Sequence, residues 1–350
     1  MTMPGGLVTA TTREGYDLPV IDLTDPRFAA PANPTAARAL HDAFVAEEER
    51  RRRVPRFVMW LMLRAAARKS RMLRALFAPR ASFLDGLSTY VMKLGPDNLM
   101  PPWDSPMDRR VAASPHVGLL RLRMQQVARL LATGLIGHLQ ADRGAPLDLI
   151  NIGGGPALDS INALILLARH HPELLERPVA IHVLDGDQDG PSFGANALAA
   201  LMSAGRPLHG RDILWRHLPY DWNVTAPLTE LIRTLTAAGV IVAASSEGAL
   251  FEYGSDEAIV ANLAALHADG SGARLVAGSV TRADEVRQRM IAQSRFRVVP
   301  RGLAGFAPLA ERAGFTIVTS TSAWLSDQVL LQPGATPMAD TNLRGDTIDA

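Results

Sequence analysis

The sequence predicts an α/β protein with a mostly parallel β-sheet that has helices on both faces. A helical region precedes this sheet in the chain. Three observations lead to this prediction. After Arg143, short apolar runs alternate with segments of helical pattern, which is typical of parallel strands joined by helices. The runs are nearly continuous in apolar residues, as expected of strands buried on both faces. Before Arg143 the pattern is helical, with one proline-rich interruption.

The part of the chain before the sheet divides into an arm and a helical region. Residues 1–35 are rich in Pro, Thr and Asp, so we expect an extended N-terminal arm. Residues 36–143 form the helical region. Its proline-rich interruption contains four prolines together with the turn-forming Gly95 and Asn98, which predicts a long structured loop. We expect helices over residues 37–53, 56–77 and 115–139, and the loop over residues 88–106.

Six apolar segments within residues 144–335 are expected to build the sheet. Each of the first five is followed by a helical segment, and the sixth is long enough for two adjacent strands. Residues 336–350 are polar, and we expect a flexible tail there. The apolar segments are residues 147–152, 179–185, 213–221, 240–245, 274–280 and 316–333.

The composition excludes several classes of protein. The net charge of +1 argues against a nucleic-acid protein with a basic surface. The chain has no cysteine, which removes disulfides, thiolate metal sites and a cysteine nucleophile. It has neither an apolar signal core at its N-terminus nor a run of 18 apolar residues, so we expect a cytoplasmic protein without a membrane span.

The segment 50–80 has eleven arginines and lysines and no acidic residue. Such a segment can lie on an anionic membrane or bind nucleic acid. Its apolar run 57–63 also suits a helix that packs on the core or on a second subunit, with its basic side in water. We favour packing. We therefore expect no membrane and no nucleic-acid partner, and we consider a homodimer through the N-terminal helices.

A glycine-rich turn follows the first strand of the sheet. It consists of Gly153, Gly154, Gly155 and Pro156, and a helix is expected to start near Asp159. Glycines let the backbone approach a ligand closely, and a helix N-terminus offers free N–H groups and a positive dipole end. The dinucleotide fingerprint G-x-G-x-x-G fails here, and the Gly-Lys-Ser/Thr of a phosphate-binding loop is absent. The turn therefore predicts a binding site of another kind.

The turn resembles motif I of the class I S-adenosylmethionine (SAM) dependent methyltransferases, written D-h-G-x-G-x-G with h apolar. Gly153 and Gly155 match the first two glycines, Ala157 stands at the third, and Asn151 stands at the acid. The resemblance extends over residues 145–333. It implies a Rossmann-like sheet with a C-terminal antiparallel hairpin, and an N-terminal helical lid. It also implies SAM as cofactor, and methyl transfer to a small acceptor in small-molecule (secondary) metabolism.

The resemblance also implies roles for particular residues. An acid after the second strand would hold the ribose of SAM, and both Asp185 and Asp187 are candidates. Asp221, with Trp222 beside it, would meet the adenine. The end of the fourth strand would face the reacting atoms, which makes Ser245, Ser246 and Glu247 candidate catalytic residues, followed by Glu252 and Tyr253. Tyr220 is a further candidate, and the lid would contribute Tyr90 together with Met92, Lys93 and Trp103.

Asn151 leaves an alternative reaction open. Without a carboxylate beside it, the amine of SAM keeps some neutral form near pH 7, because an α-amino group titrates at about 7.7–8.0. A neutral amine could attack the carbon next to sulfur, close a four-membered ring and release methylthioadenosine, as in azetidine-2-carboxylate synthases, which share this fold. The alternative to methyl transfer is therefore a SAM cyclase.

No metal site is expected. The stretch 185–190 imitates the start of a calcium-binding EF-hand loop, but the twelfth position is Asn196 instead of Glu and a strand precedes it. The adjacent His170 and His171 would point apart, and no other histidine spacing suggests zinc.

Overall fold

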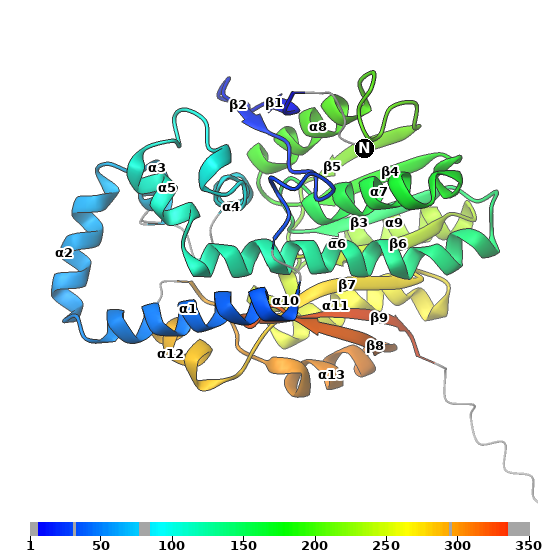
Figure 1. Ribbon diagram of the computed structural model, residues 1–350. Coiled ribbons are helices and arrows are strands. Elements are labelled where there is room, and N and C mark those ends of the chain that lie inside the picture. The colour runs from blue at the N-terminus through cyan, green and yellow to red at the C-terminus, as the bar shows by residue number, and fades with distance from the viewer. Residues whose placement is uncertain (1–5, 31–32, 77–84, 294–295, 335–350) are drawn as a thin grey trace, which may run out of the picture.

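A seven-stranded β-sheet forms one side of the molecule, on the right in Figure 1, and helices α2 to α5, which lie within residues 56–112, are on the other side. The structure is a computed structural model, and it describes residues 6–30, 33–76, 85–293 and 296–334. The order of strands in the sheet is β5-β4-β3-β6-β7-β9-β8. Strand β9 runs antiparallel to both of its neighbours, and the remaining pairs are parallel. The strands are β3 (Leu147–Ile152), β4 (Val179–Leu184), β5 (Ile213–Leu218), β6 (Ile241–Ser246), β7 (Leu275–Thr281), β8 (Phe315–Ser322) and β9 (Ser326–Pro333).

The fold class predicted from the sequence is confirmed. The sheet is mostly parallel and closes with an antiparallel hairpin, and every predicted strand lies within three residues of its expected bounds. The tail predicted over residues 336–350 lies outside the described residues.

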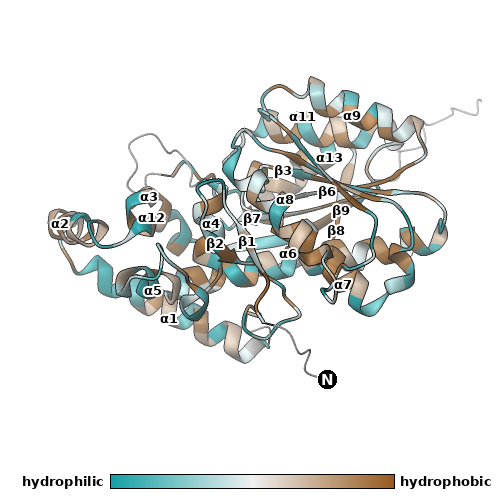
Figure 2. Cartoon of the chain, turned by 90° about the horizontal axis from the view of Figure 1, so that it is seen from above, coloured by the Kyte–Doolittle hydropathy of each residue, from teal (hydrophilic) through white to brown (hydrophobic). Residues whose placement is uncertain are grey.

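Helices cover both faces of the sheet, as the view from above shows (Figure 2). On one face they enclose one hydrophobic core, and on the other face they enclose a second. The first group is α6 (Pro115–Ala141), α7 (Leu158–His170) and α8 (Asp189–Met202), and the second is α9 (Ala226–Ala237), α11 (Asp256–His267) and α13 (Gly302–Arg312). The short α10 (Leu250–Tyr253) and α12 (Glu285–Gln293) follow β6 and β7.

Strand β3 shows why the apolar runs become central strands. Its side chains alternate between the two faces. Leu149 therefore packs in the core between the sheet and helices α6 and α7. Ile150 packs in the core on the other face, between the sheet and helices α9 and α11. Both are fully buried, and burying such a side chain contributes about 1.5–3 kcal/mol. A polar residue would lose this stabilisation on either face, which explains the continuous apolar pattern.

The described part of the predicted arm is folded against the rest of the chain. It forms the hairpin β1 (Thr9–Thr11) and β2 (Asp17–Pro19), which packs on α8. Leu18 belongs to the core below α6 and α7. The Asn162 side chain on α7 accepts a hydrogen bond from the Leu23 amide at 2.8 Å and donates one to a neighbouring carbonyl at 3.1 Å. Residues 6–30 of the predicted arm therefore contain a short hairpin and pack on the rest of the chain.

The helical region differs from its prediction at two places. The helix expected over 56–77 is broken at Ser70, whose hydroxyl donates to Asp108 and accepts from the Leu73 amide. The loop expected over 88–106 begins as a helix, because Asp85 caps it by accepting from the Ser88 amide at 2.7 Å. The elements are α1 (Pro34–Arg52), α2 (Arg56–Ala67), α3 (Arg71–Leu76), α4 (Gly86–Lys93), a 3₁₀ turn (Pro96–Asn98) and α5 (Pro106–Ala112).

Helices α6 and α2 of the N-terminal helical region lie in different parts of the molecule. α6 packs along the sheet against α7, β7 and β9, whereas α2 lies at the far edge of the molecule (Figure 1). In the described ranges, no helix combines the length and the apolar character needed to span a bilayer.

Candidate active site

A cavity of about 2030 Å³ opens where the parallel strands end. Its wall is formed by the segments that follow β3, β4, β5 and β6, and by α4 above them. Strand order reverses between β3 and β6, and ligands of doubly wound sheets bind in the crevice at such a point. The cavity continues outward between α1, α2, α5 and α12. We call this outer part the outer compartment.

The glycine turn forms one wall of the cavity and has no room for side chains. Gly153 has φ +67°, and a Cβ on it would lie 2.8 Å from the Cβ of Ala249 and 3.1 Å from the ring of Trp222. Gly155 has φ +55°, and its Cβ would lie 2.7 Å from the Cα of Gly86 on α4. Glycine is therefore required at both positions, and α4 lies directly on the turn.

Ala157, at the third glycine position of the motif, keeps the backbone shape of a glycine. Its φ is 51° and its ψ 45°, in the left-handed region. A non-glycine residue loses roughly 1–2 kcal/mol in that region. The departure from the motif therefore changes the side chain but leaves the path of the backbone intact.

Asp185 follows β4 and lies on the cavity wall beside the turn. Its two carboxylate oxygens accept from the Gly155 amide at 2.8 Å and from the Asp187 amide at 2.9 Å. Burial raises the pKa of Asp185, while these two hydrogen bonds act in the opposite direction. The oxygens of Asp187 accept from amides at the start of α8, including that of Gly190 at 3.2 Å. Asp187 thus stabilises its own loop and the start of α8, whereas Asp185 connects its loop to the glycine turn.

The segment after β5 contributes an exposed acid and two aromatic rings. Asp221 lies at the mouth of the cavity and accepts from the Asn223 amide at 2.9 Å. Trp222 packs on Gly153. The Tyr220 hydroxyl donates to Asn262 at 2.6 Å, and burial raises the pKa of this tyrosine. Tyr220 lines the cavity, but its hydroxyl is held by Asn262.

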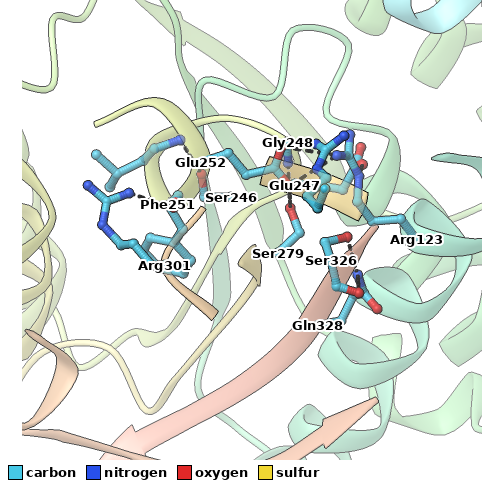
Figure 3. Close-up of polar contacts among 12 residues, drawn as sticks. Arg123, Ser246, Glu247, Gly248, Phe251, Glu252, Ser279, Arg301, Ser326 and Gln328 are labelled. Carbon is cyan, nitrogen blue, oxygen red and sulfur yellow. Dashed lines mark hydrogen bonds and ion pairs between the residues drawn. The ribbon is translucent and has the colours of Figure 1, made fainter. Parts of the chain in front are cut away.

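Four buried charged side chains meet on the wall between β6, α4 and α6, and we call them the charge cluster: Lys93, Arg123, Glu247 and Glu252. Figure 3 labels three of them, Arg123, Glu247 and Glu252. Arg123 joins two carboxylates, with Nε 2.5 Å from Glu247 and Nη1 3.0 Å from Glu252. Lys93 forms an ion pair with Glu247. The Ser279 hydroxyl donates to Glu252 at 3.0 Å and accepts from the Gly248 amide at 2.8 Å.

The charge cluster determines what Glu247 can do. Burial alone would raise the pKa of this carboxyl, but the charges of Arg123 and Lys93 together lower it below its usual value. Glu247 is therefore a carboxylate at neutral pH and accepts protons poorly. It can act through its charge and by positioning, more than as a general base.

The sequence singled out Lys93 and Glu247 but not Arg123. A signal was present, because Arg123 stands in an i, i+4 row of buried residues along α6. Its other members are Leu119, Val127, Leu131, Leu135 and Leu139. A single arginine in an otherwise apolar row of this kind must find a buried partner.

Three candidate catalytic residues do not reach the cavity wall, namely Asn151, Ser245 and Ser246. Asn151 is fully buried, and its amide nitrogen donates to Asp159 at 2.7 Å, to Ser245 at 3.1 Å and to Ser160 at 3.3 Å. The Ser246 hydroxyl donates to a β3 carbonyl at 3.0 Å and accepts from an α10 amide at 3.0 Å. All three side chains hold the ends of β3 and β6 together.

This placement removes the premise of the cyclase. The hypothesis required Asn151 beside the amine of SAM, but Asn151 lies beneath the glycine turn, where a Cβ on Gly154 would be 2.1 Å from its Oδ1. Its nearest charged neighbour is also a carboxyl, Asp159, whose pKa is raised by burial. Nothing in the geometry of Asn151 favours cyclisation over methyl transfer.

The lid residues are only partly brought to the cavity. Tyr90, Met92 and Lys93 line it. The Tyr90 hydroxyl accepts from the Ile21 amide at 3.0 Å and donates to another backbone group, so it holds the N-terminal segment onto α4. Trp103 does not line the cavity, because its ring packs edge-on against Tyr16 at 5.5 Å.

Across the described ranges, the structure brings together no three His, Asp or Glu side chains that could hold a metal ion. In the EF-hand-like stretch 185–190, the carboxylates of Asp185 and Asp187 accept backbone amides of the glycine turn and of their own loop.

No protein-family model and no curated protein sequence matches the chain. Among solved structures, a possible exported protein from Bordetella parapertussis is similar over 87% of this chain and 100% of that chain, with 17% identity and a TM-score of 0.52. The mitomycin 7-O-methyltransferase is similar over 87% and 74% of the two chains, with 14% identity and a TM-score of 0.40. A methyltransferase of calicheamicin biosynthesis is similar over 93% and 80%, with 17% identity and a TM-score of 0.38. At such identities, the first of these likenesses concerns the fold alone.

Proposed function

We propose that this chain is a SAM-dependent enzyme that transfers a methyl group to a small-molecule acceptor. One observation carries the proposal. The cavity lies at the carboxyl ends of the strands, is lined by the glycine turn and Asp185, and measures about 2030 Å³. Pockets for a single small ligand measure roughly 300–1,000 Å³. The cavity therefore has room for a cofactor and, beside it, an acceptor in the outer compartment.

The residues at the strand ends fit the cofactor. Gly153 and Gly154 line the cavity with backbone alone, and Asp185 would accept hydrogen bonds from the two ribose hydroxyls. Asp221 would accept from the adenine amine, next to the ring of Trp222. When bound, SAM would supply a methyl group on a positively charged sulfur.

The wall provides positioning rather than a strong base. Glu247 is neutralised by Lys93 and Arg123. His116 also lines the cavity, and burial together with nearby arginines lowers its pKa to about 3. It is a neutral imidazole at pH 7 and a weak proton acceptor. The enzyme would act by holding the acceptor in line and excluding water, so an acceptor whose nucleophilic group ionises readily suits this site.

Asp185→Ala tests the cofactor assignment. We expect it to weaken binding of S-adenosylhomocysteine by about 1–3 kcal/mol in titration calorimetry, because a charged acceptor is lost. Asp189→Ala is the matched control, since Asp189 begins α8 four residues after Asp185, has a half-exposed side chain and pairs with Arg13. Unchanged affinity in Asp185→Ala, with the fold checked by circular dichroism, would contradict the assignment.

A second experiment tests the reaction. The protein is incubated with SAM, with and without a pool of small-molecule acceptors, and the products are analysed by mass spectrometry. S-Adenosylhomocysteine that forms only with the pool supports methyl transfer. Methylthioadenosine that forms from SAM alone would refute it in favour of the cyclase.

A further inference from the structure

Arg287 is a buried arginine with which no acidic side chain of the described residues forms an ion pair. It lies on α12, lines the cavity and is 5% exposed. Its Nε is enclosed without a hydrogen-bond acceptor, and its Nη1 reaches only the sulfur of Met290, at 3.7 Å. The backbone amide of Arg287 bonds to Asp284, but no hydrogen bond or ion pair joins the guanidinium to that carboxylate within the described residues.

The charges around Arg287 do not balance. Three buried cations line this part of the cavity, namely Lys93, Arg123 and Arg287, against two buried carboxylates, Glu247 and Glu252. Arg123 already forms ion pairs with both carboxylates, and Lys93 forms one with Glu247. Burial lowers the pKa of Arg287, and the charge of Glu252 only partly offsets this effect. Since arginine stays protonated in proteins, one positive charge is left without compensation.

The other ionisable groups facing Arg287 do not provide the missing anion. Burial raises the pKa of Tyr253 to about 12, so this phenol is neutral at pH 7. Burial lowers the pKa of His116 to about 3, so this imidazole is neutral as well. Asp284 is exposed and pairs with Arg282. Arg51 is a further cation, and it pairs with the partly buried Glu47 and Glu48 on its own helix.

Beside Arg287, the outer compartment has an apolar wall. Its side chains come from α2, α5, α6 and α12 and are those of Met59, Met62, Leu63, Met107, Leu120 and Met290. Charged side chains of α1 and α5 also line the compartment, namely Glu47, Glu48, Arg51, Arg52 and Arg110. A ligand that fills this space gains burial of its own apolar surface. Among the described residues, Arg287 is the one buried charge of this compartment that the protein leaves without an ion pair.

We propose that Arg287 binds the carboxylate of an otherwise apolar acceptor. The proposal rests on the proposed function, because it assigns the outer compartment to the acceptor. A monoanion matches the single uncompensated charge, whereas a phosphate dianion would overcompensate it. The planar guanidinium binds a planar carboxylate through two parallel hydrogen bonds. The substrate class is therefore a hydrophobic carboxylic acid.

Matched acids and amides test the proposal in the presence of saturating S-adenosylhomocysteine. The probes are cinnamate against cinnamamide and decanoate against decanamide, with affinity measured by calorimetry. We expect the protein to bind at least one acid about 10- to 100-fold more tightly than its amide, as a hydrogen bond to a charged group implies. Arg287→Met should abolish this preference and leave amide binding unchanged. Arg289→Met, on the exposed side of the same helix, should retain it.

A structural role for Arg287 predicts a different result. It would make Arg287→Met unstable, whereas removal of an uncompensated buried charge should leave the melting temperature unchanged or higher. Arg287→Lys keeps the charge and should retain a weaker acid preference. The proposal is overturned if no acid binds, if acids and amides bind equally, or if the preference survives in Arg287→Met. If the wild-type protein does not bind S-adenosylhomocysteine but still prefers acids to amides, the proposed function is refuted and the carboxylate site stands.

Discussion

Replacing Asn151 with aspartate would place two carboxyl groups in contact inside the protein. The amide nitrogen of Asn151 donates to Asp159 at 2.7 Å, and both residues are at most 1% exposed. In Asn151→Asp this donor becomes an acceptor. Two carboxylates at such a distance cannot both be ionised, so the folded protein must bind a proton that the unfolded chain does not.

The loss of folding stability in Asn151→Asp equals the free energy of binding that proton. An unfolded Asp has a pKa of about 3.9, and each pH unit is worth about 1.36 kcal/mol, so protonation at pH 7 costs roughly 4 kcal/mol. The folded state binds more protons than the unfolded state, and its stability therefore falls as pH rises. The penalty should be about 4 kcal/mol at pH 7, about 1.5 kcal/mol at pH 5, and close to zero near pH 4.

Urea unfolding followed by far-UV circular dichroism measures this penalty. Wild type, Asn151→Asp and Asn151→Ala are compared between about pH 5 and pH 8. The alanine variant loses the same hydrogen bonds but gains no acid, so its penalty should change little with pH. A penalty in Asn151→Asp that is equal at both ends of the range, or no larger than that of alanine at pH 7, would refute the reasoning.

Four further predictions concern the turn, the charge cluster and the surface. Lys93→Met should destabilise the protein by about 3 kcal/mol in urea, and adding Glu247→Gln should recover part of this loss. Gly155→Ala should cost at least about 2 kcal/mol through its left-handed backbone and the contact with α4, and an unchanged urea midpoint would argue against that packing. Ala157→Gly relieves roughly 1–2 kcal/mol of backbone strain and loses about 0.8 kcal/mol of methyl burial, so a net loss above 1 kcal/mol would contradict the strain. If the N-terminal helices form a homodimer, Phe57→Glu on α2, where Phe57 is 74% exposed, should yield monomers in sedimentation velocity, and a monomeric wild type would exclude that dimer.

The sheet could be predicted closely because its signal is local. The six residues from Leu147 to Ile152 are all buried, so each contributes to the apolar run that identifies the strand. The glycine turn and Asp185 follow the same logic, since each comes directly after a strand. The path of the backbone at Ala157 shows that even the departure from the motif preserves the turn.

The parts that could not be predicted depend on contacts between distant segments. The hydroxyl of Tyr90 bonds to backbone near Ile21, and only the folded structure shows that the N-terminal segment closes a core. Arg123 and Glu252 are 129 positions apart in the chain. The hydrophobic pattern of α6 is a signal that Arg123 is buried, but it does not show which carboxylates neutralise it. Asn151 failed as a catalytic candidate because its position in the motif does not reveal which way its side chain points.

Helix α6 has a consequence for how this protein could be dissected or recombined. It is one unbroken helix of 27 residues. Its N-terminal half carries Arg123 into the cavity wall, and further along it packs on α7, β7 and β9. A hinge near residue 143 would have to tear this helix from the sheet, so opening motions must arise in the segments before Pro115. A chimera that exchanges the acceptor-facing helices should therefore take its junction at Ser114 and keep α6 with the sheet.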